Sequence, residues 1–197
     1  SAEHLGPNDH YYWDDFWAEA GLNAAERIFT RAGDKVEADK ARRLADEMRR
    51  AIERSIGRIP AGRSMGGIPA SPYRRMDAGA VGSLVADYPL QLFAPGAPRI
   101  MATVEAILRN CFHKGGFFQD IIHSGINAYL TLDVAQTLLR AGDDRFRDLS
   151  ALLDGDGRAV NAAIIGARAR EDEARAVRLM KSIGYYDASA VTTIVQT

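Results

Sequence analysis

Apolar residues recur at helical spacing along most of the chain, and the repeats end at glycine or proline. The clearest stripe lies in residues 35–56, between Asp34 and Gly57. Its apolar side consists of Ala41, Leu44, Ala45, Met48, Ile52 and Ile56. The opposite side is almost entirely charged, so the pattern predicts a helix with one buried face and one solvated face.

Five more helices are expected from the same signals, with the loop of residues 57–75 kept irregular by its glycines and prolines. The expected helices are residues 12–32, 78–87, 99–112, 125–140 and 143–153. Residues 78–87 and 125–140 are apolar around most of their circumference, which predicts burial on nearly all sides. Asp77 and Ser124 are their expected N-caps. No convincing strand precedes residue 188.

Helices of high and low polarity therefore alternate three times, in pairs of about 50–60 residues. This order predicts an all-α fold of antiparallel hairpins, arranged as part of a double-layered (α/α)6 toroid in which inner helices contact neighbours on all sides. Residues 1–153 form the expected hairpin domain. Residues 154–197 change in character and are expected to form a separate tail of two helices and a strand-like run.

Composition narrows the classes of protein that fit. The chain has 197 residues, is 47% hydrophobic and carries a formal net charge of -1, so a packed globular domain is expected and a nucleic-acid surface is not. No apolar run approaches the length of a membrane span. The chain starts with Ser1 and lacks a signal peptide, which indicates a processed product or an excised fragment. The compartment stays open, with the cytoplasm slightly favoured.

Neither a metal nor a cofactor is expected. Cys111 is the only cysteine and lies in a helical apolar pattern, which favours a buried, inert thiol. The sequence has no Cys/His metal-ligand spacing and no phosphate-binding glycine loop.

The unusual aromatic and polar residues gather just before each of the three expected inner helices. These clusters are residues 11–17, 71–77 and 117–124. In an array of antiparallel hairpins the three clusters lie at the same end, where they would line a concave small-molecule site. Aromatic rings beside carboxylates are suited to sugars, because rings stack on the apolar pyranose faces and carboxylates accept hydrogen bonds from hydroxyls. The alternative is that these aromatics are core and the acids are caps.

The expected sugar-binding residues are Tyr12, Trp13, Asp14, Trp17, Tyr73, Arg74, Phe118 and His123. Asp14 and Asp15 point about 100° apart on a helix. We therefore expect Asp14 in the pocket and Asp15 at the helix N-terminus. Asp120 lies between two aromatics and an apolar pair, surroundings that would raise its pKa and suit it to acid catalysis. Glycoside cleavage needs a second carboxylate, and the sequence does not establish that Asp14 faces Asp120.

Residues 4–153 resemble a stretch of the bacterial six-hairpin glycosidase superfamily. The resemblance is carried by residues 12–18 (YWDDFWA), 68–73 (IPASPY), 77–80 (DAGA), 116–120 (GFFQD) and 123–127 (HSGIN). It implies an oligosaccharide substrate and a ring of six hairpins, of which this chain supplies about three. It also implies that Asp14 grips hydroxyls of the sugar next to the cleaved bond and is not the proton donor. Family members continue with a catalytic Glu, and no matching stretch follows Leu153, which leaves activity open.

The tail allows two interpretations. The order of a helix, a strand and, between them, the segment Gly184-Tyr185-Tyr186-Asp187-Ala188 is similar to part of a POTRA module. The alternative is a helical hairpin that packs on an open edge of the incomplete ring. A different function is also open for the whole chain. Half a ring would expose apolar helix faces, so a non-catalytic helical scaffold that forms homo-oligomers through its open edges is the alternative.

Overall fold

In the computed structural model the described residues are 9–120 and 124–149, with isolated positions between 170 and 191. The helices are α1 (Tyr12–Ala32), α2 (Lys35–Gly57), α3 (Ala61–Ser64), η1 (Ala78–Ala86), α4 (Pro98–Cys111), α5 (Ala128–Ala141) and η2 (Asp144–Leu149). The strands are β1 (Phe112–His113), β2 (Gly116–Gln119) and β3 (Gly125–Ile126). The described chain is thus mostly helical, as expected. The boundary at residue 153 and most of the predicted tail lie outside the described residues, although the described positions between 170 and 178 are helical.

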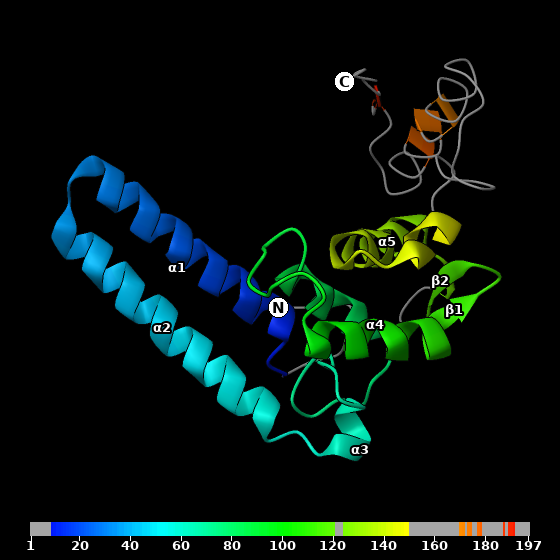
Figure 1. The fold of residues 1–197 in the computed structure, drawn as a ribbon, viewed down its shortest axis with the longest axis horizontal. Coiled ribbons are helices and arrows are strands. Elements are labelled where there is room, and N and C mark those ends of the chain that lie inside the picture. Colours follow the sequence, from blue (N-terminus) through cyan, green and yellow to red (C-terminus); the bar gives the residue numbers. More distant parts are fainter. Residues whose placement is uncertain are drawn as a thin grey trace.

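The α1–α2 hairpin forms for local reasons that the sequence contains. Gly33 ends α1 in the left-handed conformation at φ 80°, which glycine adopts without steric cost. The Asp34 side chain then caps α2 by accepting from the backbone N–H of Glu37. The two helices lie antiparallel, and their far ends project from the rest of the molecule (Figure 1). Both helices were predicted within one residue of their observed bounds.

A buried ion pair joins these two helices. The Glu19 side chain is 3% exposed, and its Oε1 accepts from Arg49 Nε at 2.7 Å. Arg49 also donates to the carbonyl of Leu92 and lies over the ring of Phe93. Burial raises the pKa of Glu19 and the Arg49 charge opposes that shift. The pair therefore fixes α2 against α1 and against the loop after η1.

Helix η1 lies at the centre of the fold. It packs against α1, α4 and α5, while α2 packs against α1 (Figure 1). The fully buried large side chains of the core are Tyr12, Phe16, Ile68, Leu84, Ile100, Val104, Ile107, Phe117, Val134 and Leu138. This contact pattern places α1, α4 and α5 around η1, with α2 on α1 and α4 also against α5.

The segment after Asp77 is buried as predicted, but η1 is a 3-10 helix rather than an α-helix. Asp77 caps it by accepting from the backbone N–H of Gly79 at 2.9 Å, which confirms the predicted cap. The segment contains Gly79 and Gly82, and glycine has a low helix propensity. Packing against helices on several sides, rather than helix propensity, therefore determines its conformation.

The prediction of no strand before residue 188 was wrong. Strands β1 and β2 form an antiparallel hairpin with Phe112 opposite Phe117, and β3 pairs with β2. Lys114 and Gly115 both have positive φ, at 51° and 78°. Two such residues in a row form the tight turn that matches the twist of a hairpin. In the sequence, Gly115 and Gly116 indicate only a break in the chain, and the hairpin turn at Lys114 and Gly115 was not predicted.

Helix α5 also starts later than predicted. Residues 125–126 belong to β3, and the N-cap is Asn127 rather than Ser124, because Asn127 Oδ1 accepts from the backbone N–H of Leu130. One side of α5 is buried, but several apolar residues are exposed, so the expected burial around most of its circumference was wrong. Leu44 of α2 is likewise 44% exposed, although it belongs to the predicted apolar stripe.

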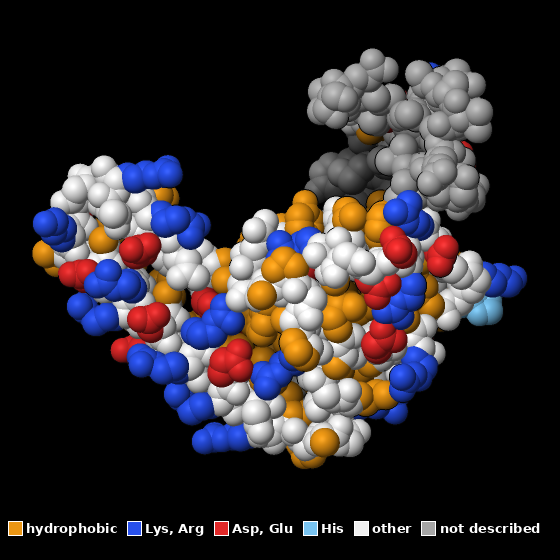
Figure 2. All heavy atoms as spheres, in the orientation of Figure 1, with side chains coloured by type: hydrophobic (Ala, Val, Ile, Leu, Met, Phe, Trp, Pro, Cys, Tyr) orange, Lys and Arg blue, Asp and Glu red, His pale blue; other side chains and the backbone are white. Residues whose placement is uncertain are grey.

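Charged and apolar side chains occupy different parts of the surface. Acidic and basic side chains intermingle along the α1–α2 hairpin, whereas apolar side chains gather over the central body (Figure 2). Within the described part of the chain, no helix has the length and apolar character needed to cross a membrane.

Candidate functional site

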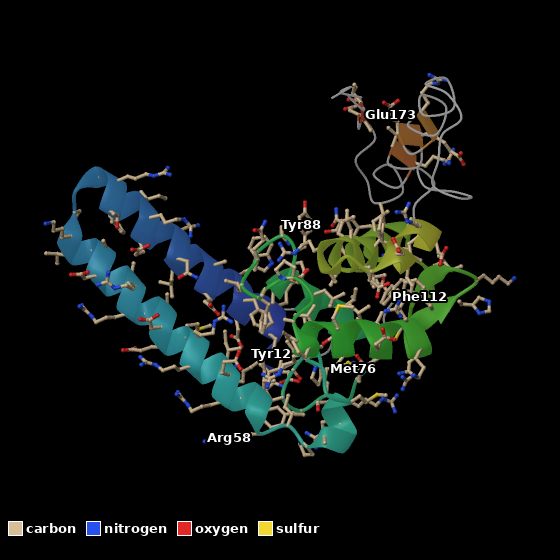
Figure 3. All side chains as sticks on the ribbon, viewed as in Figure 1. Tyr12, Arg58, Met76, Tyr88, Phe112 and Glu173 are labelled. Carbon is tan, nitrogen blue, oxygen red and sulfur yellow. The ribbon has the colours of Figure 1, made fainter. Side chains whose placement is uncertain are left out.

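The first aromatic cluster divides between the core and the surface. Tyr12 is fully buried, and its hydroxyl lies 2.8 Å from Ser55 Oγ on α2 (Figure 3). Tyr11 and Phe16 are buried as well. Tyr12 was predicted to bind substrate. Its position makes it a core residue that holds α1 against α2, so this prediction is corrected.

Trp13 and Trp17 lie on the exposed side of the same helix. They are 39% and 43% exposed, and their ring centroids are 6.0 Å apart at an interplanar angle of 55°. The Trp13 ring packs beside Gly82 of η1, where a Cβ would lie at an ordinary contact distance of 3.5 Å from the indole. The two rings with the neighbouring exposed Asp14 are called the tryptophan platform below.

Asp14 and Asp15 diverge as the helix geometry requires, but their roles differ from those expected. Asp14 is exposed beside the platform. Asp15 is half-buried and lines a cavity, so it is Asp15, and not Asp14, that faces enclosed space. Burial raises the pKa of the Asp15 carboxyl, while the nearby His10 lowers it and Asp14 raises it.

The cavity has a volume of about 650 Å³ and lies between the start of α1, the last turns of α2 and the loop that follows α2. We call it the hairpin cavity. Its charged and polar lining residues are His10, Asp15, Arg54, Ser55, Arg58, Arg63 and Tyr73. Of the predicted sugar-binding residues that the structure describes, the hairpin cavity contains only Tyr73, which is 75% exposed. The arginines were not singled out from the sequence, although two of them recur at helical spacing on α2.

The second cluster is held by an internal ion pair. Arg74 donates to Asp77 Oδ2 through Nη2 at 2.6 Å and through Nε at 3.2 Å. Asp77 also caps η1, so both residues have structural partners. Ser71 Oγ donates to Asp9 Oδ2, and the backbone N–H of Tyr12 donates to the carbonyl of Ala70 at 3.0 Å. These bonds bring the second cluster against the start of α1, as the hairpin arrangement predicted.

The third cluster follows the end of α4, close in sequence to Cys111. Burial raises the pKa of this thiol, and the nearby carboxylates of Asp77 and Asp120 raise it further, so both acids lie near the end of α4. The predicted inert, buried thiol is thus confirmed to be buried. Asp120 itself is exposed, and Ser124 Oγ lies 3.5 Å from it. The apolar enclosure expected around Asp120 is therefore absent. Phe118 is half-buried on β2, and His123 lies outside the described residues.

A carboxyl that sequence reasoning missed lies on α5. Burial raises the pKa of Asp133 to about 6. The Asp133 carboxylate in turn raises the pKa of Tyr129, one turn earlier on the helix. The signal in the sequence was an acid placed directly between Leu132 and Val134 in an otherwise apolar segment.

Among the described residues, no group of three or more His, Cys, Asp or Glu side chains is placed to hold a metal ion. Comparison with protein-family models, with curated proteins and with solved structures gave no match. Functional inference therefore depends on the geometry of the platform and of the hairpin cavity.

Proposed function

We propose that this protein binds carbohydrate on the tryptophan platform. The observation that carries the proposal is the exposure of two adjacent tryptophans at the start of a helix whose other aromatics, Tyr12 and Phe16, are fully buried. Because about two fifths of each residue stays exposed, a part of the roughly 1.5–3 kcal/mol that full burial of a large apolar side chain contributes is forgone at each position. Exposed apolar surface of this kind is characteristic of binding sites.

The geometry of the platform suits a sugar ring. The Trp13 ring packs against η1 beside Gly82, which restricts its motion while leaving part of the ring exposed. A pyranose stacked on either indole would present its edge hydroxyls to the helix. Asp14 is exposed on the adjacent side of the helix, where its carboxylate can accept hydrogen bonds from those hydroxyls.

Hydrolysis of an oligosaccharide is the activity that goes with this binding. In that reaction Asp120 would protonate the leaving glycosidic oxygen while a second carboxylate activates water or attacks the anomeric carbon. Asp77 is committed to structural bonds with Arg74 and with the η1 backbone, so a different carboxylate would have to act as the partner of Asp120.

Tryptophan fluorescence gives a direct test, because both tryptophans of the chain belong to the platform. We would titrate gluco-, manno- and galacto-oligosaccharides into the native chain and into the variants Asp14→Ala, Trp17→Ala and Asp46→Ala. A saturable change in emission is expected for one sugar class. It should weaken at least tenfold in Asp14→Ala and Trp17→Ala, and it should persist in Asp46→Ala, which alters an exposed acid on α2.

The proposal is contradicted if no sugar changes the emission of a chain that still unfolds cooperatively. Equal weakening in all three variants would also contradict it, since Asp46 is an exposed acid of α2, whereas the platform lies on α1. Release of reducing ends from the sugar that binds, and its loss in Asp120→Asn, would then test hydrolysis separately from binding.

Self-association is a second candidate function, and a specific feature of α5 favours it. Tyr129, Leu132 and Leu139 are 54%, 47% and 55% exposed. Their spacing of three and seven residues places them along one side of the helix, as in a helix–helix contact. Sedimentation velocity of the native chain and of a Leu132→Glu, Leu139→Glu variant tests this function. A dimer in the native chain that dissociates in the variant supports it, and a native monomer at high concentration excludes it.

A further inference from the structure

The hairpin cavity carries more positive charge than its own side chains neutralise. Arg54, Arg58 and Arg63 line it, and within the described part of the chain Asp15 is the single acid among its lining residues. No arginine is closely paired with Asp15, because the pKa shift of Asp15 is caused by burial, His10 and Asp14 alone. Two positive charges therefore remain in excess at the cavity.

The arrangement of Arg54 and Arg58 on α2 reinforces this excess. They are four residues apart, so their side chains are neighbours on the helix surface. No acidic residue lies three or four positions from either one in the sequence, and Arg50 extends the same row. Neither guanidinium has an ion-pair partner in the described part of the chain. Like charges at this spacing repel each other and destabilise a helix, and a bound anion would relieve this repulsion.

Arg63 approaches the cavity from the other side. It lies in the short helix α3, is half-buried, and donates from Nη1 to the carbonyl of Pro72 at 3.1 Å. That bond holds the guanidinium in place before any ligand arrives. Figure 3 shows Arg58 at the end of α2, and α3 follows a few residues later in the chain. Guanidinium groups from two elements thus border one cavity.

The rest of the wall is apolar. Met48, Ile52, Ile59 and Pro72 contribute carbon surface, and Tyr73 adds an exposed ring. A cavity of about 650 Å³ falls within the range of small-molecule sites. A ligand that fits it would combine one strongly anionic group with a ring-sized body of low polarity.

We propose that the hairpin cavity binds a small-molecule phosphate monoester, with the phosphate between the arginines and the organic body against the apolar wall. A phosphate monoester carries close to two negative charges at neutral pH and offers three oxygens, which matches both the excess charge and the number of guanidinium groups. A carboxylate would supply one charge and leave half of the excess uncompensated. This inference is independent of sugar binding on the platform, because Asp14, Trp13 and Trp17 do not line the cavity.

Calorimetric titration with phenyl phosphate, inorganic phosphate and phenol tests the proposal. The native chain should bind phenyl phosphate, inorganic phosphate more weakly, and phenol not measurably. The double variant Arg54→Gln, Arg58→Gln should weaken phenyl phosphate binding at least tenfold. The matched control Arg27→Gln, Arg43→Gln removes the same charge from exposed positions elsewhere on the hairpin and should change the affinity less than twofold.

A third variant separates the two halves of the site. Tyr73→Ala should weaken phenyl phosphate but leave inorganic phosphate unchanged, since it removes the ring contact alone. Native-like binding by the Arg54, Arg58 variant would overturn the proposal, as would an equal loss in the Arg27, Arg43 control. Phenol binding as tightly as phenyl phosphate would also overturn it, because the cavity would then recognise apolar surface without charge.

Discussion

At the scale of single residues, Asp133 of α5 is a half-buried acid in an otherwise apolar segment. Its pKa of about 6 arises from burial, and no described side chain hydrogen-bonds its carboxyl. Because the pKa is raised in the folded state, the native chain binds this proton more tightly than the unfolded chain does. The stability contribution is therefore fully present at low pH and is lost as the pH rises through the interval between about 4 and 6.

We expect Asp133→Asn to be more stable than the native chain at pH 7 by about 1–2 kcal/mol, less than the full shift because the side chain retains some contact with solvent. Near pH 4 the two chains should have similar free energies of unfolding, since the native carboxyl is then neutral. Urea unfolding at both pH values measures the difference. Asp46→Asn, at an exposed position, should show no such pH dependence. A stabilisation that is the same at both pH values would argue against a buried carboxylate.

At the scale of elements, the loop after α3 crosses α4 at very close range. A Cβ at Gly67 would lie 2.7 Å from the backbone nitrogen of Thr103 and 2.8 Å from its Cα. The next residue, Ile68, donates its backbone N–H to Thr103 Oγ1 at 2.9 Å. Glycine is needed at position 67 because only a residue without a side chain allows this approach between two backbones.

Gly67→Ala should therefore lower the free energy of unfolding by about 2–4 kcal/mol, since backbone on both sides must move apart. Gly57→Ala is the matched control, because a Cβ there meets nothing within 4 Å and alanine favours helix at the end of α2. It should be neutral or slightly stabilising. Chemical denaturation of both variants gives the comparison, and equal behaviour of the two would show that the crossing can relax.

At the scale of the whole molecule, one buried ion pair connects the segment that ends η1 to α5. Arg140 Nε donates to Asp87 Oδ2 at 3.0 Å, and Arg140 Nη2 donates to the carbonyl of Phe93. Asp87 is 1% exposed, and its Oδ1 has no hydrogen-bond partner within the described structure. Burial raises the pKa of this carboxyl, and the Arg140 charge opposes the shift.

Arg140→Ala should destabilise the fold by about 3–5 kcal/mol, because it leaves a buried carboxylate unpaired. Arg147→Ala, which breaks an exposed pair with Asp144, should cost about 0.5 kcal/mol or less. Adding Asp87→Asn to Arg140→Ala should recover part of the loss, since the amide carries no charge. Thermal unfolding followed by circular dichroism measures all three. A cost for Arg140→Ala as small as that for Arg147→Ala would mean that α5 is not fixed to η1 by this pair.

Local signals in the sequence were sufficient for the long helices. Gly33, Asp34 and Pro98 mark where helices end or begin, and the apolar repeat between these positions fixes their type. Asp77 was also recognised correctly as a cap. These features could be predicted because their interactions join residues only a few positions apart, so tertiary contacts are not needed to specify them.

The tertiary structure decided the environment of each side chain. It buried Tyr12 against α2, left the adjacent Trp13 exposed, and turned Asp15 rather than Asp14 toward a cavity. It also made η1 a 3-10 helix and exposed Leu44. The sequence by itself determined which segments become helices, because caps and periodicity act within a few turns. Which faces those helices bury, and which polar groups meet, depended on contacts between residues far apart in the chain, and no local pattern records those contacts.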